Sequence, residues 1–152
     1  MNQLTGIPAR IPVHCIAHRG ASSLAPENTL SAAQQAIALG ADMWETDVTL
    51  TRDGFPIIFH DDTPERTTNI RQVLPHKARW PVHRLSLDEL RRLDYGSWFL
   101  EQDPFGQVAA GMIPPEVQTG FRGATLLTLE EALVFTRAQH WRVNLELKDL
   151  GK

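Results

Sequence analysis

Several features that mark other classes of protein are scarce or absent in this chain of 152 residues. The single cysteine, Cys15, cannot form an internal disulfide, which excludes a disulfide-stapled scaffold and fits both a reducing compartment and a secreted protein without disulfides. No apolar run reaches the roughly 18 residues of a membrane-spanning helix. The first ten residues also lack the apolar stretch of a signal peptide. We therefore expect a soluble, cytoplasmic protein.

A basic excess is missing as well, because 15 Lys and Arg stand against 18 Asp and Glu, for a net charge of −3. This balance gives no support to a nucleic acid or an anionic membrane surface as partner. The hydrophobic fraction of 42% and the charged fraction of 22% are ordinary for a globular protein. The length suits one domain, or part of a larger one.

Strand and helix signals alternate along the chain and predict an α/β fold. The segments with strand character are residues 13–18, 43–50, 55–60 and 141–147. The first is short and mostly apolar, so we expect it to be buried on both faces. A strand, a helix and a strand at this spacing indicate a βαβ unit and a parallel sheet.

Capping residues mark the starts of three helices. Asn28 or Thr29 can cap the first, which we expect to end before Gly40. Ser86 and Thr128 each open a capping box, with a glutamate three residues later, and so begin two more helices.

The long stretch from residue 61 to residue 123 has weak strand signals and holds six of the ten prolines. We interpret it as an insertion within a single domain rather than as a separate one. Its length without strong strands makes it a candidate lid or substrate-binding loop.

Two carboxylates stand at alternate positions of the predicted strand 43–50. Glu45 and Asp47 should face one side of the sheet, and the residues between and around them the other. Adjacent carboxylates repel unless a positive charge lies between them, and Mg²⁺ or Ca²⁺ takes oxygen ligands of this kind. On its own, the pattern fits a solvated edge strand with two surface acids better than a metal site.

The last predicted strand repeats this arrangement, because Asn144, Glu146 and Lys148 share one face. Glu146 could be a third metal ligand, and Lys148 could offer a positive charge to a phosphate or an oxyanion. The simpler alternative is a surface Glu–Lys pair of small energetic value.

Two histidines, His18 and His60, stand at the carboxyl ends of predicted strands, where sites of parallel α/β folds assemble. A pair of histidines can divide the work of general base and general acid near neutral pH. Arg19 could bind a phosphate through two hydrogen bonds. Glu27 stands just before the first helix, as a ligand or as a favourable acid at a helix start.

These residues occur in an ordered set of motifs that resembles the glycerophosphodiester phosphodiesterase family, and its bacterial cytosolic members in particular. The motifs are His-Arg-Gly at 18–20, Pro-Glu-Asn-Thr at 26–29, Glu-Thr-Asp at 45–47, Thr-Arg-Asp-Gly at 51–54, His-Asp-Asp at 60–62 and Glu-Leu-Lys at 146–148. Residues 65–69, 93–99 and 126–133 are also similar to the family. Each motif alone is weak, whereas the ordered set is specific.

The resemblance implies a TIM-type (β/α)₈ barrel that hydrolyses glycerophosphodiesters to glycerol 3-phosphate and an alcohol, with one divalent metal, Mg²⁺ or Ca²⁺, as cofactor. The matching positions are Glu45, Asp47 and Glu146 for the metal, His18 and His60 for acid–base catalysis, Arg19 and Lys148 for the phosphate, and Glu27 close to the site. Which histidine is the acid and which is the base does not follow from the resemblance.

Length is the main departure from the family, since a TIM barrel needs about 250 residues. Only about four of its eight strands are expected here, so we interpret residues 1–152 as the N-terminal portion of one barrel domain. The open edges of such a sheet favour self-association. We expect a small-molecule substrate, no nucleic acid partner and no stable membrane insertion. Two alternatives are a truncated, non-catalytic remnant that binds metal or phosphate, and a related phosphodiesterase acting on lysophospholipids or phosphoinositides.

Overall fold

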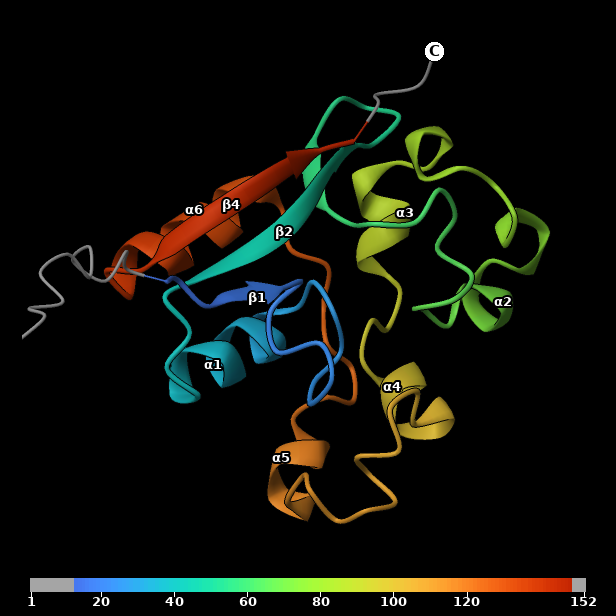
Figure 1. Cartoon of the computed structure of the whole chain (residues 1–152). Helices are drawn as coiled ribbons and strands as arrows, with labels where there is room; N and C mark the ends of the chain where they lie inside the picture. The colour runs from blue at the N-terminus through green and yellow to red at the C-terminus, as the bar shows by residue number, and fades with distance from the viewer. Residues whose placement is uncertain (1–12, 149–152) are drawn as a thin grey trace, which may run out of the picture.

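The computed structural model describes residues 13–148 (Figure 1). Its sheet consists of β1 (Ile16–His18), β2 (Met43–Leu50), β3 (Pro56–Ile58) and β4 (Arg142–Leu147). Strand β2 is central: β4 runs parallel along one side of it, and β1 runs parallel to its first half on the other side. Strand β3 is antiparallel to the end of β2. Parallel strands in an open sheet are the expected arrangement for part of a TIM-type barrel.

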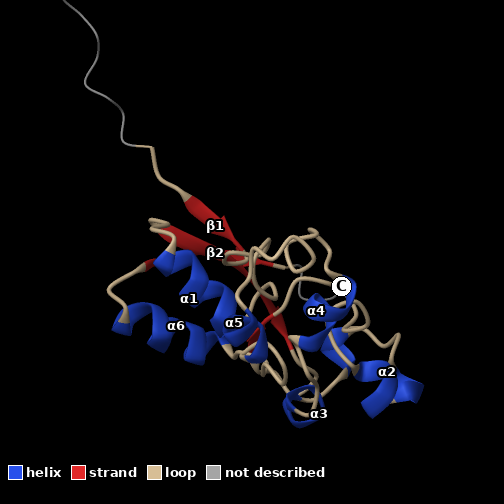
Figure 2. Cartoon of the chain, turned by 90° about the horizontal axis from the view of Figure 1, so that it is seen from below, coloured by secondary structure: helices blue, strands red, loops and turns tan. Residues whose placement is uncertain are grey.

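Two longer helices and several short ones surround this sheet. They are α1 (Leu30–Ala38), α2 (Ile70–Val73), α3 (Leu87–Arg91), α4 (Ser97–Gln102), α5 (Pro115–Thr119) and α6 (Leu129–Ala138), with 3₁₀ turns η1 (Pro75–Lys77) and η2 (Val82–Arg84). Helices α1 and α6 lie side by side against one face of the sheet (Figure 2). In the described part of the chain, no helix is long and apolar enough to cross a membrane.

The face of β2 that meets these helices carries the apolar side chains, as the alternation predicts. Trp44 and Val48 are buried against Ala33 of α1 and Ala132 of α6. The indole Nε1 of Trp44 donates a hydrogen bond to Thr136 Oγ1 at 3.0 Å, so its one polar atom is satisfied inside the core. The opposite face of β2 therefore belongs to Glu45 and Asp47.

The helix boundaries largely follow the predicted caps. Thr29 caps α1, because its Oγ1 accepts a hydrogen bond from the amide of Ala32 at 3.3 Å. Gly40 follows the helix with φ +79°, as a residue just beyond a helix end often does. The capping boxes at Ser86 and Thr128 are both formed. Asn28, the alternative cap, has a different role, described below.

Two expectations about the strands are wrong. Strand β1 begins at Ile16 rather than residue 13 and is not buried on both faces, since Ile16 is 48% exposed. Within residues 13–148, β1 pairs only with β2 and therefore lies at an edge. The third strand, expected over 55–60 as one of the barrel strands, spans only Pro56–Ile58 and runs antiparallel to β2, because the short turn at Gly54 can join only antiparallel neighbours.

The stretch from 61 to 123 folds into short helices and turns that share their cores with the rest of the molecule. One core joins Ile70, Leu85 and Leu90 to Ile57 of β3 and to Phe59 just after it. A second core joins the aromatic residues of α4 to α1. The stretch is thus packed onto the sheet end and α1, and its description as an insertion stays a prediction.

Gly20 allows the loop after β1 to pass directly against α1. Its φ is +81°, and a Cβ there would lie 2.6 Å from the backbone carbon of Ala32. Gly54 has a similar φ of +82° with nothing within 4 Å, so it offers a matched control.

We predict that both Gly20→Ala and Gly54→Ala lower the free energy of unfolding by about 1–2 kcal/mol through backbone strain. Gly20→Ala should lose a further 1–3 kcal/mol or so through overpacking against Ala32. Urea unfolding of the two variants measures the difference. Equal losses would show that the close approach at Gly20 does not constrain the fold.

Candidate active site

Three carboxylates meet on the open face of the sheet. The ligand atoms of Glu45, Asp47 and Glu146 lie within 4.8 Å of one another. The register of the parallel strands causes this, because Asp47 on β2 stands opposite Glu146 on β4, and Glu45 lies two residues earlier on the same face. Glu45 and Asp47 are buried, whereas Glu146 is exposed.

Lys148 supplies a positive charge to this group. Its Nζ lies 2.9 Å from Asp47 Oδ1 and 2.5 Å from Glu146 Oε1. Its backbone amide donates to the carbonyl of Val48 at 2.9 Å, which continues the pairing of β4 with β2 and fixes the side chain beside the carboxylates. Burial lowers the pKa of Lys148, but the hydrogen bonds to Glu146 and Asp47 outweigh it and raise that pKa above its ordinary value.

Asn28 satisfies the other oxygen of Asp47. Its Nδ2 donates to Asp47 Oδ2 at 2.9 Å, while its Oδ1 accepts from Thr46 Oγ1 at 2.6 Å. Burial raises the pKa of Asp47, yet the hydrogen bonds from Asn28 and Lys148 hold it below its ordinary value. Asn28 has φ +57°, a conformation that asparagine tolerates better than most residues. Sequence reasoning considered Asn28 only as a helix cap, although its place in the Pro-Glu-Asn-Thr motif was a signal.

Glu45 and Asp47 each have a buried oxygen without a hydrogen bond, but Lys148 lies beside the one on Asp47, whereas no cation among the described residues lies beside the one on Glu45. Oε2 accepts a hydrogen bond from the amide of Arg19 at 3.1 Å and lies 3.8 Å from His18 Nε2. Oε1 is buried and has no hydrogen-bond partner among the described residues. An unsatisfied buried carboxylate oxygen is costly, and a hard cation is a ligand that would satisfy it. The donor set therefore fits a divalent metal.

Arg19 connects this group to a second acidic group. It has φ +57° in the turn after β1. Its Nη1 donates to Glu27 Oε1 at 3.0 Å, and its Nε lies 3.4 Å from Asp47 Oδ2. The neighbouring His18 ends β1 and has 65% of its side chain exposed. The predicted phosphate-binding arginine thus lies between both sets of carboxylates.

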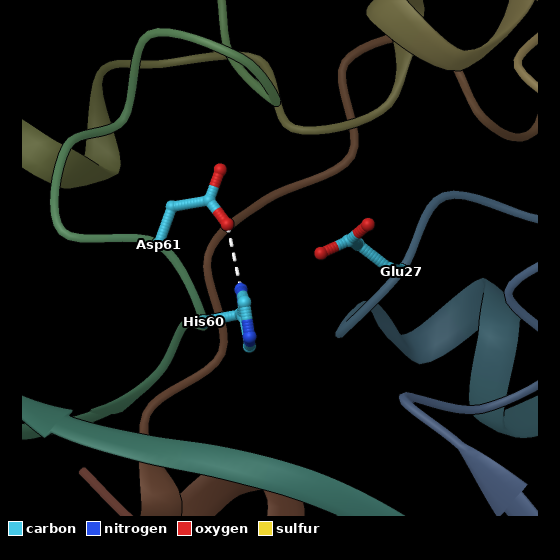
Figure 3. A group of neighbouring side chains, drawn as sticks. All are labelled: Glu27, His60 and Asp61. Atoms are coloured by element: carbon cyan, nitrogen blue, oxygen red, sulfur yellow. Dashed lines mark hydrogen bonds and ion pairs between the residues drawn. The ribbon is translucent and has the colours of Figure 1, made fainter.

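The second acidic group consists of Glu27, His60 and Asp61, whose ligand atoms also lie within 4.8 Å of one another. His60 and Asp61 follow β3, whereas Glu27 approaches from the loop before α1 (Figure 3). His60 Nδ1 lies 2.6 Å from Asp61 Oδ1. Arg66, which sequence reasoning did not assign to the site, donates hydrogen bonds to both Glu27 and Asp61. Its signal was its place in the family-like stretch 65–69.

The predicted site residues thus gather around the middle of β2, where β1 and β3 end beside it. The carboxylates of β2 and β4 form one group with Lys148, and Glu27 belongs to the other with His60. His18 contacts the first group and Arg19 contacts both. The arrangement can bind a cation and an anion side by side and offers two imidazoles for proton transfer.

Comparison with known proteins agrees with the motifs. Residues 18–150 match the Glycerophosphoryl diester phosphodiesterase family. A glycerophosphodiester phosphodiesterase of Caldanaerobacter subterraneus is 35% identical over 88% of this chain and 44% of its own length. The human glycerophosphoinositol inositolphosphodiesterase GDPD2 is 38% identical over 88% of this chain and 24% of its own length.

Solved structures lead to the same family and confirm the predicted fold class. A glycerophosphodiester phosphodiesterase from Agrobacterium tumefaciens matches with a TM-score of 0.69 and 33% identity, over 91% of this chain and 48% of that one. A phosphodiesterase from Oleispira antarctica, in complex with the product sn-glycerol-3-phosphate, matches with a TM-score of 0.67 and 34% identity, over 90% and 44%. This chain spans less than half the length of these relatives. It belongs to the glycerophosphodiester phosphodiesterase family.

Proposed function

We propose that this chain carries a metal-dependent site that hydrolyses glycerophosphodiesters to glycerol 3-phosphate and an alcohol. The observation that carries the proposal is the meeting of Glu45, Asp47 and Glu146 beside the cations of Arg19 and Lys148. Such a site suits a substrate that is itself an anion. Membership of the family supports the same reaction class.

The metal ligands in this proposal are Glu45, Asp47 and Glu146. The free Oε1 of Glu45 supports the assignment, as does the all-oxygen donor set, which suits Mg²⁺ or Ca²⁺. When bound, a divalent cation would neutralise phosphate charge and stabilise the charge that develops in the transition state. Asn28 and Lys148 keep Asp47 ionised and therefore able to act as a ligand.

Arg19 and Lys148 are the proposed phosphate-binding residues. Both positive groups are held near Asp47 by buried or half-buried contacts, so little side-chain freedom remains to be lost when an anion binds. The planar guanidinium of Arg19 can donate two parallel hydrogen bonds to phosphate oxygens, whereas the Lys148 ammonium acts as a point charge.

His18 and His60 are the proposed acid–base pair. Hydrolysis breaks the bond between phosphorus and the alcohol oxygen, which needs a proton, and forms a new bond from an attacking hydroxyl, which must lose one. One imidazole takes the proton of the attacking group and the other protonates the leaving oxygen. His18 ends β1 beside Glu45, and His60 follows β3, which runs back along β2 as far as Val48. Both histidines therefore lie close to Glu45 and Asp47, which supports a shared reaction centre.

The identity of the alcohol separates two candidate substrates. The product complex of the Oleispira antarctica relative favours release of sn-glycerol 3-phosphate. The name of the human relative, a glycerophosphoinositol inositolphosphodiesterase, favours glycerophosphoinositol as a second candidate substrate, with an inositol phosphate as the product. Product analysis of both substrates distinguishes them, because only the first reaction yields glycerol 3-phosphate.

We predict that the purified chain releases glycerol 3-phosphate from glycerophosphocholine with Mg²⁺ or Ca²⁺, and that chelator abolishes release. His18→Ala and His60→Ala should each lower kcat by about 100-fold or more, because each removes a proton-transfer group. His140→Ala, at an exposed residue between α6 and β4, is the control. Wild-type rates in either site variant would contradict its catalytic role.

We also predict that Glu45→Gln weakens divalent metal binding about tenfold or more, because it removes a ligand charge. Calorimetric titration of the chain with Mg²⁺ and Ca²⁺ measures the effect. Glu130→Gln, at an exposed glutamate on α6, removes the same charge outside the site and should bind metal as the wild type does. Metal binding without measurable hydrolysis would instead favour a non-catalytic chain that binds metal or phosphate.

A further inference from the structure

Arg66 holds together two carboxylates that would otherwise repel each other. Its Nη1 and Nη2 donate to Glu27 at 2.8 and 2.7 Å, and its Nε and Nη2 donate to Asp61 at 2.6 and 2.9 Å. The guanidinium thus forms a fork with each acid, the geometry that arginine alone among the cationic side chains provides. Hydrogen bonds to Glu27 and then to Asp61 raise the pKa of Arg66, so it stays charged.

The face of this guanidinium is also supported. The Cζ of Arg66 lies 5.7 Å from the centre of the Trp98 ring, within the range of a cation–π contact. Trp98 belongs to α4 and is buried, with its own Nε1 donating to the carbonyl of Tyr95 at 3.0 Å. Trp98 therefore packs against the face of the Arg66 guanidinium, while Glu27 and Asp61 accept the hydrogen bonds from its edge.

The hydrogen bonds that Glu27 and Asp61 already accept argue against a metal ion among Glu27, His60 and Asp61. Arg66 contacts all four carboxylate oxygens of Glu27 and Asp61, and Arg19 contacts Glu27 as well. The two acids are therefore already neutralised. The neighbouring Glu45, by contrast, keeps a buried oxygen without a donor.

Asp61 in turn decides which nitrogen of His60 carries a proton. Burial raises the pKa of Asp61, but hydrogen bonds from Arg66 and His60 hold it below its ordinary value, so the carboxylate only accepts hydrogen bonds. His60 Nδ1, at 2.6 Å, must then be the donor. A neutral His60 consequently keeps its lone pair on Nε2, the nitrogen that points away from Asp61.

We propose that Arg66 is a positioning residue that acts through Asp61 to fix the ring orientation and the Nδ1–H tautomer of His60. This inference rests on the proposed acid–base role of His60. It assigns to the residue 61–123 stretch a part in the reaction, since Arg66 and its Trp98 support both come from it.

The first test reads the tautomer without any substrate. We expect ¹⁵N–¹H correlation spectra of the histidine rings, recorded about two pH units above the ordinary histidine pKa of about 6.5, to show His60 protonated on Nδ1. Arg66→Gln frees Asp61 to turn away, and Asp61→Ala removes the acceptor, so in both variants the proton should move to Nε2 in a large fraction of molecules. Asp61→Ala leaves Arg66 bound to Glu27 and serves if Arg66→Gln does not fold.

The second test separates positioning from substrate binding. Arg66→Gln should lower kcat by roughly tenfold or more while KM changes by less than about twofold, because the lost interaction orients a reacting group rather than the substrate. Arg71→Gln is the matched control: Arg71 lies in the same stretch and pairs with Glu65 at 2.6 Å, outside the site. It should keep the wild-type tautomer and kcat.

The outcomes are distinct. A wild-type His60 protonated mainly on Nε2, or an unchanged tautomer in both Arg66→Gln and Asp61→Ala, would overturn the proposal whatever the activity. A lower kcat in Arg71→Gln equal to that in Arg66→Gln would also overturn it, since the effect would then be general. A tautomer shift in a chain without phosphodiesterase activity would support the positioning role and refute the proposed function instead.

Discussion

The burial of Asp47 is the constraint on which the rest of the site depends. A carboxylate that is wholly removed from solvent must be paired and hydrogen-bonded, or it would be neutral. Its partners come from three distant segments: Arg19 after β1, Asn28 before α1, and Lys148 after β4. The contacts that Asp47 needs therefore bring segments from near both ends of the described chain to β2. The other functional residues lie in or beside these segments.

Apolar packing on the opposite face of β2 offsets the free-energy cost of burying Asp47. Trp44 and Val48 fill the space under α1 and α6 with apolar contacts, and Trp141 stacks on Trp44 at 6.2 Å. One strand thus separates two environments by the alternation of its side chains alone. This division is why Glu45 and Asp47 could be placed on one face from the sequence, and why that expectation is confirmed.

Hydrophobic periodicity and capping motifs were sufficient to predict where strands and helices lie in the sequence, but not how those elements pack against one another. The bounds of β2 and the capping boxes at Ser86 and Thr128 depend on neighbouring residues, so they could be predicted. The exposure of β1 depends on which strands flank it, which no local pattern records. The antiparallel direction of β3 follows from the tight turn at Gly54, a signal that was present but not used.

The site shows the same limit. The acids were found because spacing on a strand determines which face a side chain takes, and the histidines because they stand where predicted strands end. Asn28 and Arg66 lie in turns, where spacing carries no such information, and their roles arise from contacts across 19 and 39 residues of sequence. Their motifs marked them as family-like without showing what they touch.

The two acidic groups differ in how their charge is balanced, and this difference assigns their tasks. Around Glu27 and Asp61, the rigid fork of Arg66 contacts every carboxylate oxygen, and Arg19 adds a second positive charge at Glu27. Around Asp47 and Glu146, the positive charges are the Lys148 ammonium and the Arg19 guanidinium, whose Nε lies 3.4 Å from Asp47 Oδ2, and Glu45 keeps an oxygen without a donor. This group therefore keeps a carboxylate oxygen for an incoming ion, whereas every carboxylate oxygen of Glu27 and Asp61 already accepts a hydrogen bond from a rigid guanidinium. The first group is therefore suited to hold a histidine still, and the second to receive a metal ion and a phosphate.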